Sequence, residues 1–417
     1  MTRRTGSADL PLHGGRVPPW LSTRMAALGR VIVEAVVHHY GRDEVLRRLA
    51  HPFWFQSFGA VMGMDWHSSG ITTSVLGALK RGLKPLEHEL GIYVCGGKGA
   101  QSRKTPLELM TIGERTGLDA NPLARTSKLV AKVDSAAVQD GYALYLHGFI
   151  VTKDGHWCVV QQGMSEEKGE ARRYHWLSEQ LEGFLDSPHS AIEGRNQGAI
   201  VNLADKRAER NRRAGLELVH AGPDTTINVL RRLRDDGNTA LNFDLFDQPA
   251  ASPDPQPLTP HLQMPAHHEV RASDVVLKRL HGVLAAAADR GPTDFTELLL
   301  TPGVGARTVA SLALVAEVLH GTPSRFSDPA RFAMAHGGKD GHPFPVPLKV
   351  YDETIRVLKT AVDHAKLGNA DRLAAIQRLD SQARALERVA TGPSFEAFIA
   401  NERANSDEYG GRTVFTK

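Results

Sequence analysis

The chain has 417 residues, of which 41% are hydrophobic, so it is long and apolar enough to build an ordinary core and to divide into two or three domains. Fifty Lys and Arg residues stand against 47 Asp and Glu residues, and the formal net charge of +3 means that local basic clusters would have to bind any polyanionic partner. The two cysteines, Cys95 and Cys158, exclude a disulfide framework and favour reduced, buried thiols in a cytoplasmic protein. No stretch approaches the about 18 to 20 apolar residues of a membrane span, so we expect no membrane association.

The first predicted unit, residues 1–128, has mixed character. Residues 20–50 carry apolar side chains at helical spacing and predict two helices joined near Gly41. An aromatic stretch follows at 51–70. Its aromatic side chains are expected to lie in the core, and stacking on nucleic-acid bases is the alternative.

A basic, glycine-rich loop is predicted at 95–108, "CGGKGAQSRKTPLE". Its amides are expected to form a concave anion site, although the order of residues is not that of a Walker A loop, and a solvated basic loop is the alternative. Two adjacent arginines further along, Arg172 and Arg173, are a second candidate for phosphate binding. The nucleic-acid-binding candidates in the loop are Lys98, Ser102, Arg103 and Lys104.

The second predicted unit, residues 129–246, combines a β-meander with helices. Residues 129–163 are rich in β-branched and aromatic residues and contain the turn signals "QDG" and "KDG", which predicts three strands. A helix is expected at 171–185, a short strand at 199–204 and a charged helix after it. The fold class is therefore α+β, and the order of elements is compatible with a ribonuclease-H-like domain.

Carboxylates along this unit suggest a metal centre. In ribonuclease-H-like nucleases, acids on a first strand, a helix and a later strand hold two Mg²⁺ or Mn²⁺ ions that activate water. Asp134, Glu179 or Glu182, and Asp205 follow that order and are the catalytic and metal-ligand candidates. Asp140 fits a turn better than a metal site. Carboxylates are common, so an unrelated distribution is the alternative, and no histidine spacing indicates zinc.

The third unit, residues 271–417, follows a Pro-rich linker at 247–270 and is predicted to be mostly α-helical. Within it, "LLTPGVGARTV" (299–309) predicts a helix, a Pro-Gly-Val-Gly corner and a second helix. The glycines let the backbone pass close to another chain, and the amides at the start of the second helix favour an anion such as a phosphate. A plain corner between two helices is the alternative. The candidate contacts are Gly303, Val304, Gly305, Arg307 and Thr308.

This stretch resembles the helix-hairpin-helix of DNA-repair glycosylases and nucleases, and the resemblance implies binding to the DNA backbone. In glycosylases that are also lyases, a lysine stands at the position of Arg307. An arginine cannot form the Schiff base, so lyase chemistry is not expected. Arg325 stands where the glycosylase aspartate would be. Asp328 is the nearest candidate, with a helix N-cap as its other interpretation.

The sequence also resembles, over nearly its whole length, the prokaryotic family known as domain of unknown function 763. Since that family implies no activity, the expected function rests on the motifs: a DNA-binding protein of DNA repair or processing that acts as a metal-dependent nuclease with Mg²⁺ or Mn²⁺. A base-excision glycosylase and a non-catalytic DNA-binding adaptor are the alternatives. RNA is left open as a partner, and the oligomeric state is not indicated. The segments that carry the resemblance are "TGSADLPLHGGRVPPWL" (5–21), "CGGKGAQSRKTP" (95–106), "KVDSAAVQDGYALYLHGFI" (132–150), "TPGVGARTV" (301–309) and "GGKDGHPFPV" (337–346).

Overall fold

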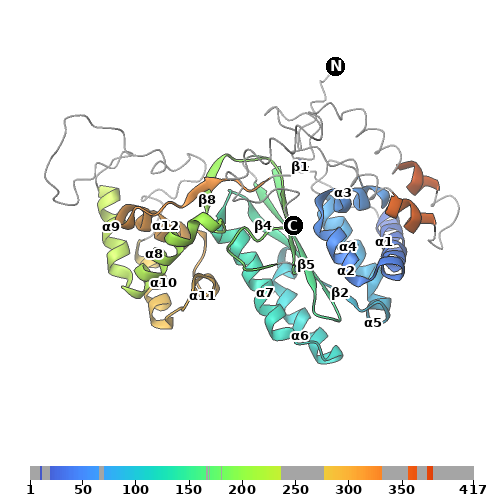
Figure 1. Cartoon of the computed structure of the whole chain (residues 1–417), viewed down its shortest axis with the longest axis horizontal. Coiled ribbons are helices and arrows are strands. Elements are labelled where there is room, and N and C mark those ends of the chain that lie inside the picture. The colour runs from blue at the N-terminus through green and yellow to red at the C-terminus, as the bar shows by residue number, and fades with distance from the viewer. Residues whose placement is uncertain are drawn as a thin grey trace, which may run out of the picture.

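The molecule is a mixed α+β protein, as the sequence predicted. Its described parts contain two antiparallel sheets and the helices packed around them. The larger sheet lies between the N-terminal helices and a pair of helices that follows the strand Ile92–Lys98 (Figure 1). None of the helices in these parts is both long enough and apolar enough to cross a bilayer. The computed structural model describes residues 10–11, 19–64, 70–165, 168, 170–179, 181–235, 277–330, 356–363 and 373–378.

The N-terminal helices cover one face of the large sheet. The break between the first two falls at Gly41, as predicted, and the aromatic side chains of the third helix are buried in the core. A Cβ atom on Gly82 would lie 2.3 Å from the carbonyl oxygen of Ala26, so the first and fourth helices pack backbone against backbone. The elements are α1 (Pro19–Tyr40), α2 (Arg42–Ala50), α3 (Pro52–Val61), α4 (Gly70–Leu83), the 3₁₀ turn η1 (Lys84–Leu86) and α5 (Glu87–Leu90).

The large sheet is antiparallel throughout, with the order β1-β6-β5-β4-β2 and with β7 paired to β6. Almost every residue of β5 and β6 is buried, because helices cover the sheet on both faces. Such doubly covered strands lack the usual alternation of apolar and polar residues. The strands are β1 (Leu10–Pro11), β2 (Ile92–Lys98), β4 (Ala143–Thr152), β5 (Trp157–Ser165), β6 (Glu170–Leu177) and β7 (Ala191–Glu193).

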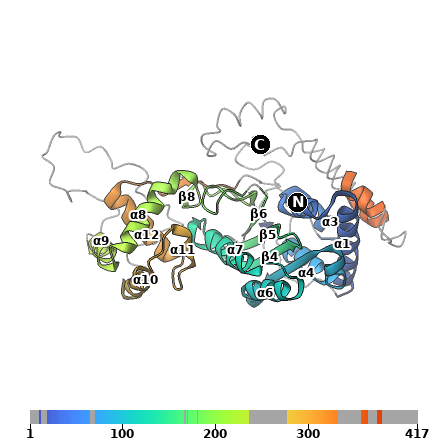
Figure 2. The ribbon, with the colours of Figure 1, turned by 60° about the horizontal axis from the view of Figure 1, so that its bottom comes forward.

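The opposite face of the large sheet is covered by an antiparallel pair of helices. The chain leaves β2 through the short helix η2 (Gly99–Lys104), forms α6 (Thr105–Thr116) and returns through α7 (Ala120–Lys132). α7 continues into a π-helical turn, η3 (Val133–Ala137). Figure 2 shows α7 passing beside α11 (Phe295–Leu300) of the C-terminal helices, and these two helices are in contact.

The C-terminal helices gather around a small second sheet of order β3-β8-β9. Its last strand comes from beyond α12, so this sheet joins segments that are far apart in the sequence. The elements are β3 (Val138–Gln139), β8 (Ala199–Asn202), η4 (Lys206–Ala208), α8 (Glu209–His220), α9 (Pro223–Asp235), α10 (Leu277–Arg290), α11 (Phe295–Leu300), α12 (Ala306–His320) and β9 (Arg325–Ser327).

Two predicted elements are wrong, and with them the ribonuclease-H-like order. The expected strand at the start of 129–163 is the end of α7 and η3, because its apolar residues bury one side of a helix against the sheet. The expected helix at 171–185 begins instead with β6, whose polar side chains find buried partners on both faces. The turns at Gly141 and Gly155, both with positive φ, and the strand and helix after residue 199 are as predicted.

The predicted unit boundaries do not coincide with boundaries between elements of the described structure. The boundary after residue 128 falls inside α7, and one hydrophobic cluster joins residues from before it, from the central strands and from α10 to α12. The predicted linker at 247–270 lies outside the described residues.

Candidate functional site

The predicted corner between two C-terminal helices is formed. α11 ends at Leu300 and α12 begins at Ala306. Val304 anchors the turn between them, because its side chain is only 1% exposed and belongs to the core. Pro302 and Gly303, by contrast, are exposed. We call residues 301–307 the hairpin surface.

The start of α12 offers unsatisfied backbone donors on this surface. The first hydrogen bond of the helix runs from the amide of Val309 to the carbonyl oxygen of Gly305. The amides of Ala306, Arg307 and Thr308 have no acceptor among the described residues, and Gly305 provides no side-chain cap. Free amides and the helix dipole together favour an anion at this point.

The predicted contacts on this surface differ in their accessibility. The side chain of Arg307 is exposed and forms no ion pair within the described segments, so it remains available. Thr308 is only 6% exposed, so the hydroxyl contact predicted for it faces the interior. Val304 contributes its backbone alone, and its carbonyl oxygen accepts a hydrogen bond from Lys132 Nζ at the end of α7.

The basic loop after β2 already holds an anion of the protein itself. The amide of Gly96 donates to Glu108 Oε2 at 2.6 Å, and Lys80 Nζ lies 2.7 Å from the other carboxylate oxygen. Ser102 Oγ donates to the carbonyl of Gly99 and closes the turn. The carboxylate of Glu108 therefore already occupies the anion site that the glycines predict. The side chains of three predicted contacts are still exposed: Lys98, Arg103 and Lys104.

Arg172 and Arg173, the second candidate for phosphate binding, are completely buried in β6, so neither guanidinium is accessible to a phosphate in this structure. Adjacent strand residues point to opposite faces of a sheet. Arg172 accordingly pairs with acids on the α7 side, while Arg173 Nη1 lies 2.7 Å from Glu193 and its Nε donates to Thr72 of α4. The positive charges of Arg172 and Arg173 are therefore neutralised by acids inside the molecule.

The carboxylates predicted to share metal ions are held by separate partners. Glu179 is half-exposed and accepts two hydrogen bonds from Arg47, at 2.6 and 2.7 Å. Asp205 caps η4 and pairs with Arg207. Across the described ranges, no three His, Cys, Asp or Glu side chains come close enough together to hold a metal ion. The predicted two-metal arrangement of Asp134, Glu179 and Asp205 is thus not formed there.

Asp134 is the centre of a buried polar network. It lies in the π-helix η3 with no exposed surface, and its Oδ2 accepts hydrogen bonds from Gln161 Nε2 at 2.5 Å and Trp176 Nε1 at 2.9 Å. Its Oδ1 lies 2.5 Å from His189 Nε2. Any ligand of this carboxylate would have to displace three donors. Isolated π-helical turns and left-handed residues such as Ser187 (φ 55) often mark functional sites.

The network continues through the sheet to α7. Gln161 Oε1 accepts a hydrogen bond from His147 Nδ1 at 2.6 Å, and His147 Nε2 accepts one from Ser127 Oγ at 2.9 Å. Burial lowers the pKa of His147, so the imidazole is neutral and can both donate and accept. A continuous chain of buried hydrogen bonds therefore links Ser127, on α7, to Asp134 and His189.

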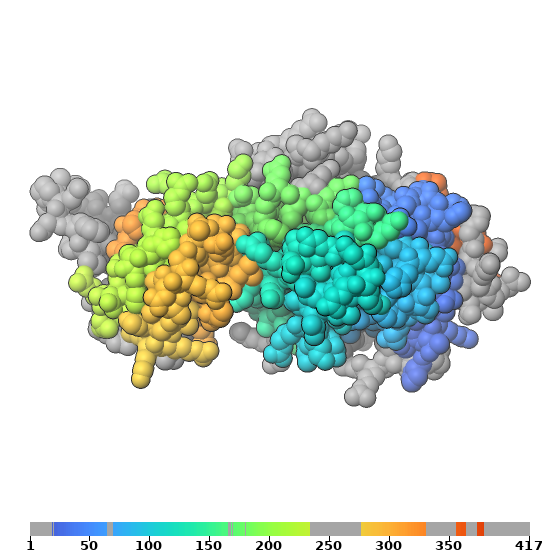
Figure 3. Space-filling model, turned by 90° about the horizontal axis from the view of Figure 1, so that it is seen from below, coloured from blue at the N-terminus to red at the C-terminus, as the bar shows by residue number. Residues whose placement is uncertain are grey.

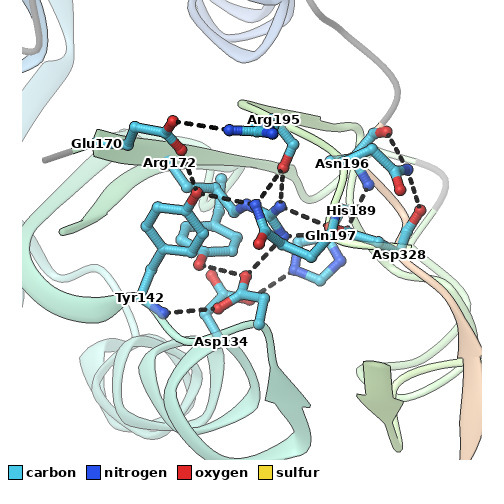
Figure 4. A network of polar contacts seen from close by, with 12 residues as sticks. Asp134, Tyr142, Glu170, Arg172, His189, Arg195, Asn196, Gln197 and Asp328 are labelled. Carbon is cyan, nitrogen blue, oxygen red and sulfur yellow. Dashed lines mark hydrogen bonds and ion pairs between the residues drawn. The ribbon is translucent and has the colours of Figure 1, made fainter. Parts of the chain in front are cut away.

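A second part of the network surrounds Arg172 and joins the large sheet to the segment that follows β9 (Figure 4). Its guanidinium contacts both oxygens of Asp328, at 2.9 and 2.6 Å, and Asp140 Oδ2 at 2.9 Å. The ring of Tyr142 stacks on it at 4.7 Å. The carboxylate of Asp328 is occupied by Arg172 and by the amides of Gln197 and Ala330, and most of the residues that a helix capped by Asp328 would contain lie outside the described residues.

Sequence reasoning missed the basic side of α7 and the histidine partner of Asp134. The sequence pattern predicts a strand at Lys132, and a strand there does not indicate its position beside the hairpin surface. A helical interpretation of 120–137 would have shown cations at residues 125, 128 and 132, spaced for one face. His189 carried no local signal, because it stands in an irregular segment and meets Asp134 only in the folded chain.

Comparison with known proteins agrees with the sequence resemblance. The family model described as "Protein of unknown function (DUF763)" matches residues 6–346, nearly the whole chain. No curated protein and no solved structure gives a significant match. The matched region contains the basic loop, the Asp134 network and the hairpin surface, and the chain therefore belongs to the DUF763 family.

Proposed function

We propose that this protein binds the sugar-phosphate backbone of DNA through its hairpin surface. The single observation that carries the proposal is that neither the backbone conformation of Gly305 nor a close neighbour requires a glycine at this position. Gly303 has φ 87, and a Cβ atom there would lie 3.3 Å from Val283, so the turn itself needs that glycine. Gly305 has an extended backbone, and a Cβ atom there would meet nothing within 4 Å. A glycine in open space suits the close approach of another molecule.

The chemistry of the surface supports a phosphate as the group that approaches. The free amides of α12 point out of the helix end, and exposed Arg307 stands in the same turn. Amides and an arginine together give short, charge-assisted hydrogen bonds to phosphate oxygens. They contact the backbone and read no bases, so binding is expected to depend on salt and not on sequence.

The role in DNA repair or processing rests on the resemblance of 299–309 to the helix-hairpin-helix of repair glycosylases and nucleases. RNA offers the same phosphates, and only a contact to its 2′-hydroxyl would distinguish the two sugars. Parallel assays with DNA and RNA therefore belong to the test.

A substitution at Gly305 tests the proposal against the plain corner between helices. Serine is a preferred N-cap residue whose hydroxyl accepts from the amides of the first turn. Gly305→Ser should keep or raise the thermal stability of the protein, while its side chain occupies the amides that the phosphate would use. We expect at least a tenfold loss of affinity for labelled duplex DNA, measured by fluorescence anisotropy, and a similar loss for Arg307→Ala.

The matched control is Gly282→Ala, a glycine substitution in open space on α10 and outside the hairpin surface. It should leave DNA binding unchanged. If Gly305→Ser and Arg307→Ala bind DNA as tightly as the parent, or the parent does not bind, the hairpin surface is a structural corner and the proposal fails.

Incubation of the same protein with single-stranded, duplex and branched DNA in Mg²⁺, Mn²⁺ or EDTA distinguishes the three proposed activities, when a denaturing gel, an analysis of released bases and a native gel are combined. Metal-dependent strand cleavage would identify the proposed nuclease, whose ligands would then have to be sought beyond the Asp134, Glu179 and Asp205 trio. Release of a free base with intact strands would identify a glycosylase. A clear mobility shift without turnover, the outcome that the separated carboxylates favour, would identify a DNA-binding adaptor.

A further inference from the structure

The exposed side of α7 carries three cations that form no ion pair among the described residues. Arg125, Lys128 and Lys132 are spaced by three and four residues, which places them along one face of the helix. Arg125 and Lys128 are exposed, and Lys132 is partly exposed. The sole carboxylate between residues 120 and 137 is Asp134, which is buried. We call these three cations the α7 stripe.

The α7 stripe leads to the hairpin surface. At its far end, Lys132 Nζ donates to the carbonyl oxygen of Val304 in the turn, and Gln139 reaches the carbonyl oxygen of Ala306. At its near end, Arg125 lies close to the carboxylates of Asp294 and Glu297, at the start of α11. α7 and α11 therefore run in the same direction, side by side. Figure 3 shows the teal atoms of α6 and α7 against the orange atoms of α10 to α12 on one face.

The nearby acids do not cancel this charge. Asp294 caps α11 by accepting from the amide of Glu297, and Glu297 accepts from the amide and hydroxyl of Thr293. Both acids lie at the Arg125 end. Among the described residues no carboxylate forms an ion pair with Lys128, Lys132 or Arg307, so the positive charge increases toward the turn. Lys132 uses one of its three ammonium donors, which leaves two for a ligand.

We infer that the α7 stripe is a second contact surface for the same DNA strand, continuous with the hairpin surface. The inference rests on the proposed function and deepens it. The stripe spans seven residues of helix, about 10 Å, and a strand of DNA advances about 3.4 Å along the axis per phosphate. Consecutive phosphates of one strand are farther apart than this rise, because the strand winds around the axis, so the stripe has the length of a short run of phosphates, followed by the phosphate at α12. Its partner is the backbone of one strand.

The test is the salt dependence of binding, because each phosphate contact contributes about 0.9 to the slope of log K against log salt. We would replace Arg125 and Lys128 together by glutamine and measure the binding of a short fluorescein-labelled DNA duplex. The slope should fall by about 1.8, and the affinity near 0.15 M salt should fall about 30-fold. The conservative variant Lys128→Arg should bind as the parent does.

A double control removes the same charge elsewhere, at exposed Lys153 in the β4–β5 turn and exposed Lys206 in η4. It should leave the slope within about 0.5 of the parent's. An equal fall in the control would mean that net charge is responsible, and would overturn the inference.

The two proposals fail separately. If the Arg125 and Lys128 variant keeps the parental slope while Arg307→Ala weakens binding, the α7 stripe is a solvated surface and the hairpin proposal survives. If no variant changes binding, both fail. Circular-dichroism melting of each variant shows that a loss of binding is not a loss of fold, since the replaced side chains are exposed.

Discussion

The guanidinium of Arg172 and the carboxylate of Asp328 lie face to face, although 156 residues separate them in the sequence. Two parallel hydrogen bonds join them, at 2.9 and 2.6 Å, and neither side chain has any exposed surface. This pair connects the strand β6 of the large sheet to the segment after β9.

Asp328→Ala should therefore be severely destabilising. It leaves the Arg172 guanidinium buried with one acid, Asp140, in place of two, and the loss of one partner of a buried pair costs about 3 to 5 kcal/mol. Urea unfolding measures this cost. Glu209→Ala, which breaks an exposed pair with Arg213, should change the free energy of unfolding by less than about 1 kcal/mol. Equal effects of the two changes would show that the buried pair is not needed for stability.

Two replacements of Asp134 should distinguish the contribution of its charge to the free energy of unfolding from that of its hydrogen bonds. Asp134→Ala removes the acceptor of Gln161, Trp176 and His189, and each buried donor left without a partner costs about 1 to 3 kcal/mol. Asp134→Asn keeps one acceptor oxygen and should cost less. Unfolding followed by tryptophan fluorescence checks the order of the two variants, and a smaller cost for alanine than for asparagine would contradict it.

Acid should destabilise the protein partly through His51. Burial, and to a smaller extent the charge of Arg48, lowers the pKa of His51 to about 4, while its Nδ1 accepts from the amide of Trp54 at the start of α3. The unfolded chain, with a pKa of about 6.5, then binds a proton more readily than the folded one. The free energy of unfolding should fall by up to about 3 kcal/mol as the pH drops from about 6.5 to about 4.

His51→Asn keeps an N-cap acceptor without a titrating group, so it should remove this part of the pH dependence. Buried His147 and His175, whose pKa values burial also lowers, act in the same direction and remain in the variant. Urea unfolding at several pH values compares the two proteins, and an unchanged pH profile would exclude His51 as a source.

Two glycine-to-alanine changes should shift the free energy of unfolding in opposite directions. Gly303→Ala places a Cβ atom on a left-handed residue (φ 87), 3.3 Å from Val283, and should cost about 1 to 2 kcal/mol. Gly282→Ala lies within α10, where a Cβ atom would meet nothing within 4 Å, and should stabilise by about 0.5 to 1 kcal/mol. Thermal melting of both variants is sufficient, and a shift in the same direction would contradict the geometry of the turn.

Local signals in the sequence predicted the first helices and the C-terminal corner between helices correctly. The break at Gly41, the aromatic core of α3 and the corner at 301–305 follow from periodicity and from glycine chemistry, which act over a few residues. The β4–β5 hairpin follows from its turn residues. These features depend on neighbouring residues and not on contacts with segments that are far away in the sequence.

The errors concern residues whose environment is set by distant segments. β6 contains "ARRYHW", which would be a surface segment in most proteins, and here Glu193, Asp140 and Asp328 neutralise its arginines. The Asp134 network likewise joins α7, two strands and the loop before β7. No pattern of spacing contains those partners, so the buried site could not be found from the sequence, whereas the hairpin surface could.

The two neighbouring arginines of β6 also determine the register in which this strand pairs with β5. In a strand that is covered on both faces, an apolar pattern alone does not distinguish the correct pairing from one displaced by a single residue. Arg172 pairs opposite Gly163 and finds its acids on one side of the sheet, and Arg173 pairs opposite Gln162 and finds its acid on the other. A displacement by one residue would turn each arginine to the opposite face of the sheet, away from the acids and hydrogen-bond partners it has in this register. The pair therefore locks β6 into a single register from both sides at once.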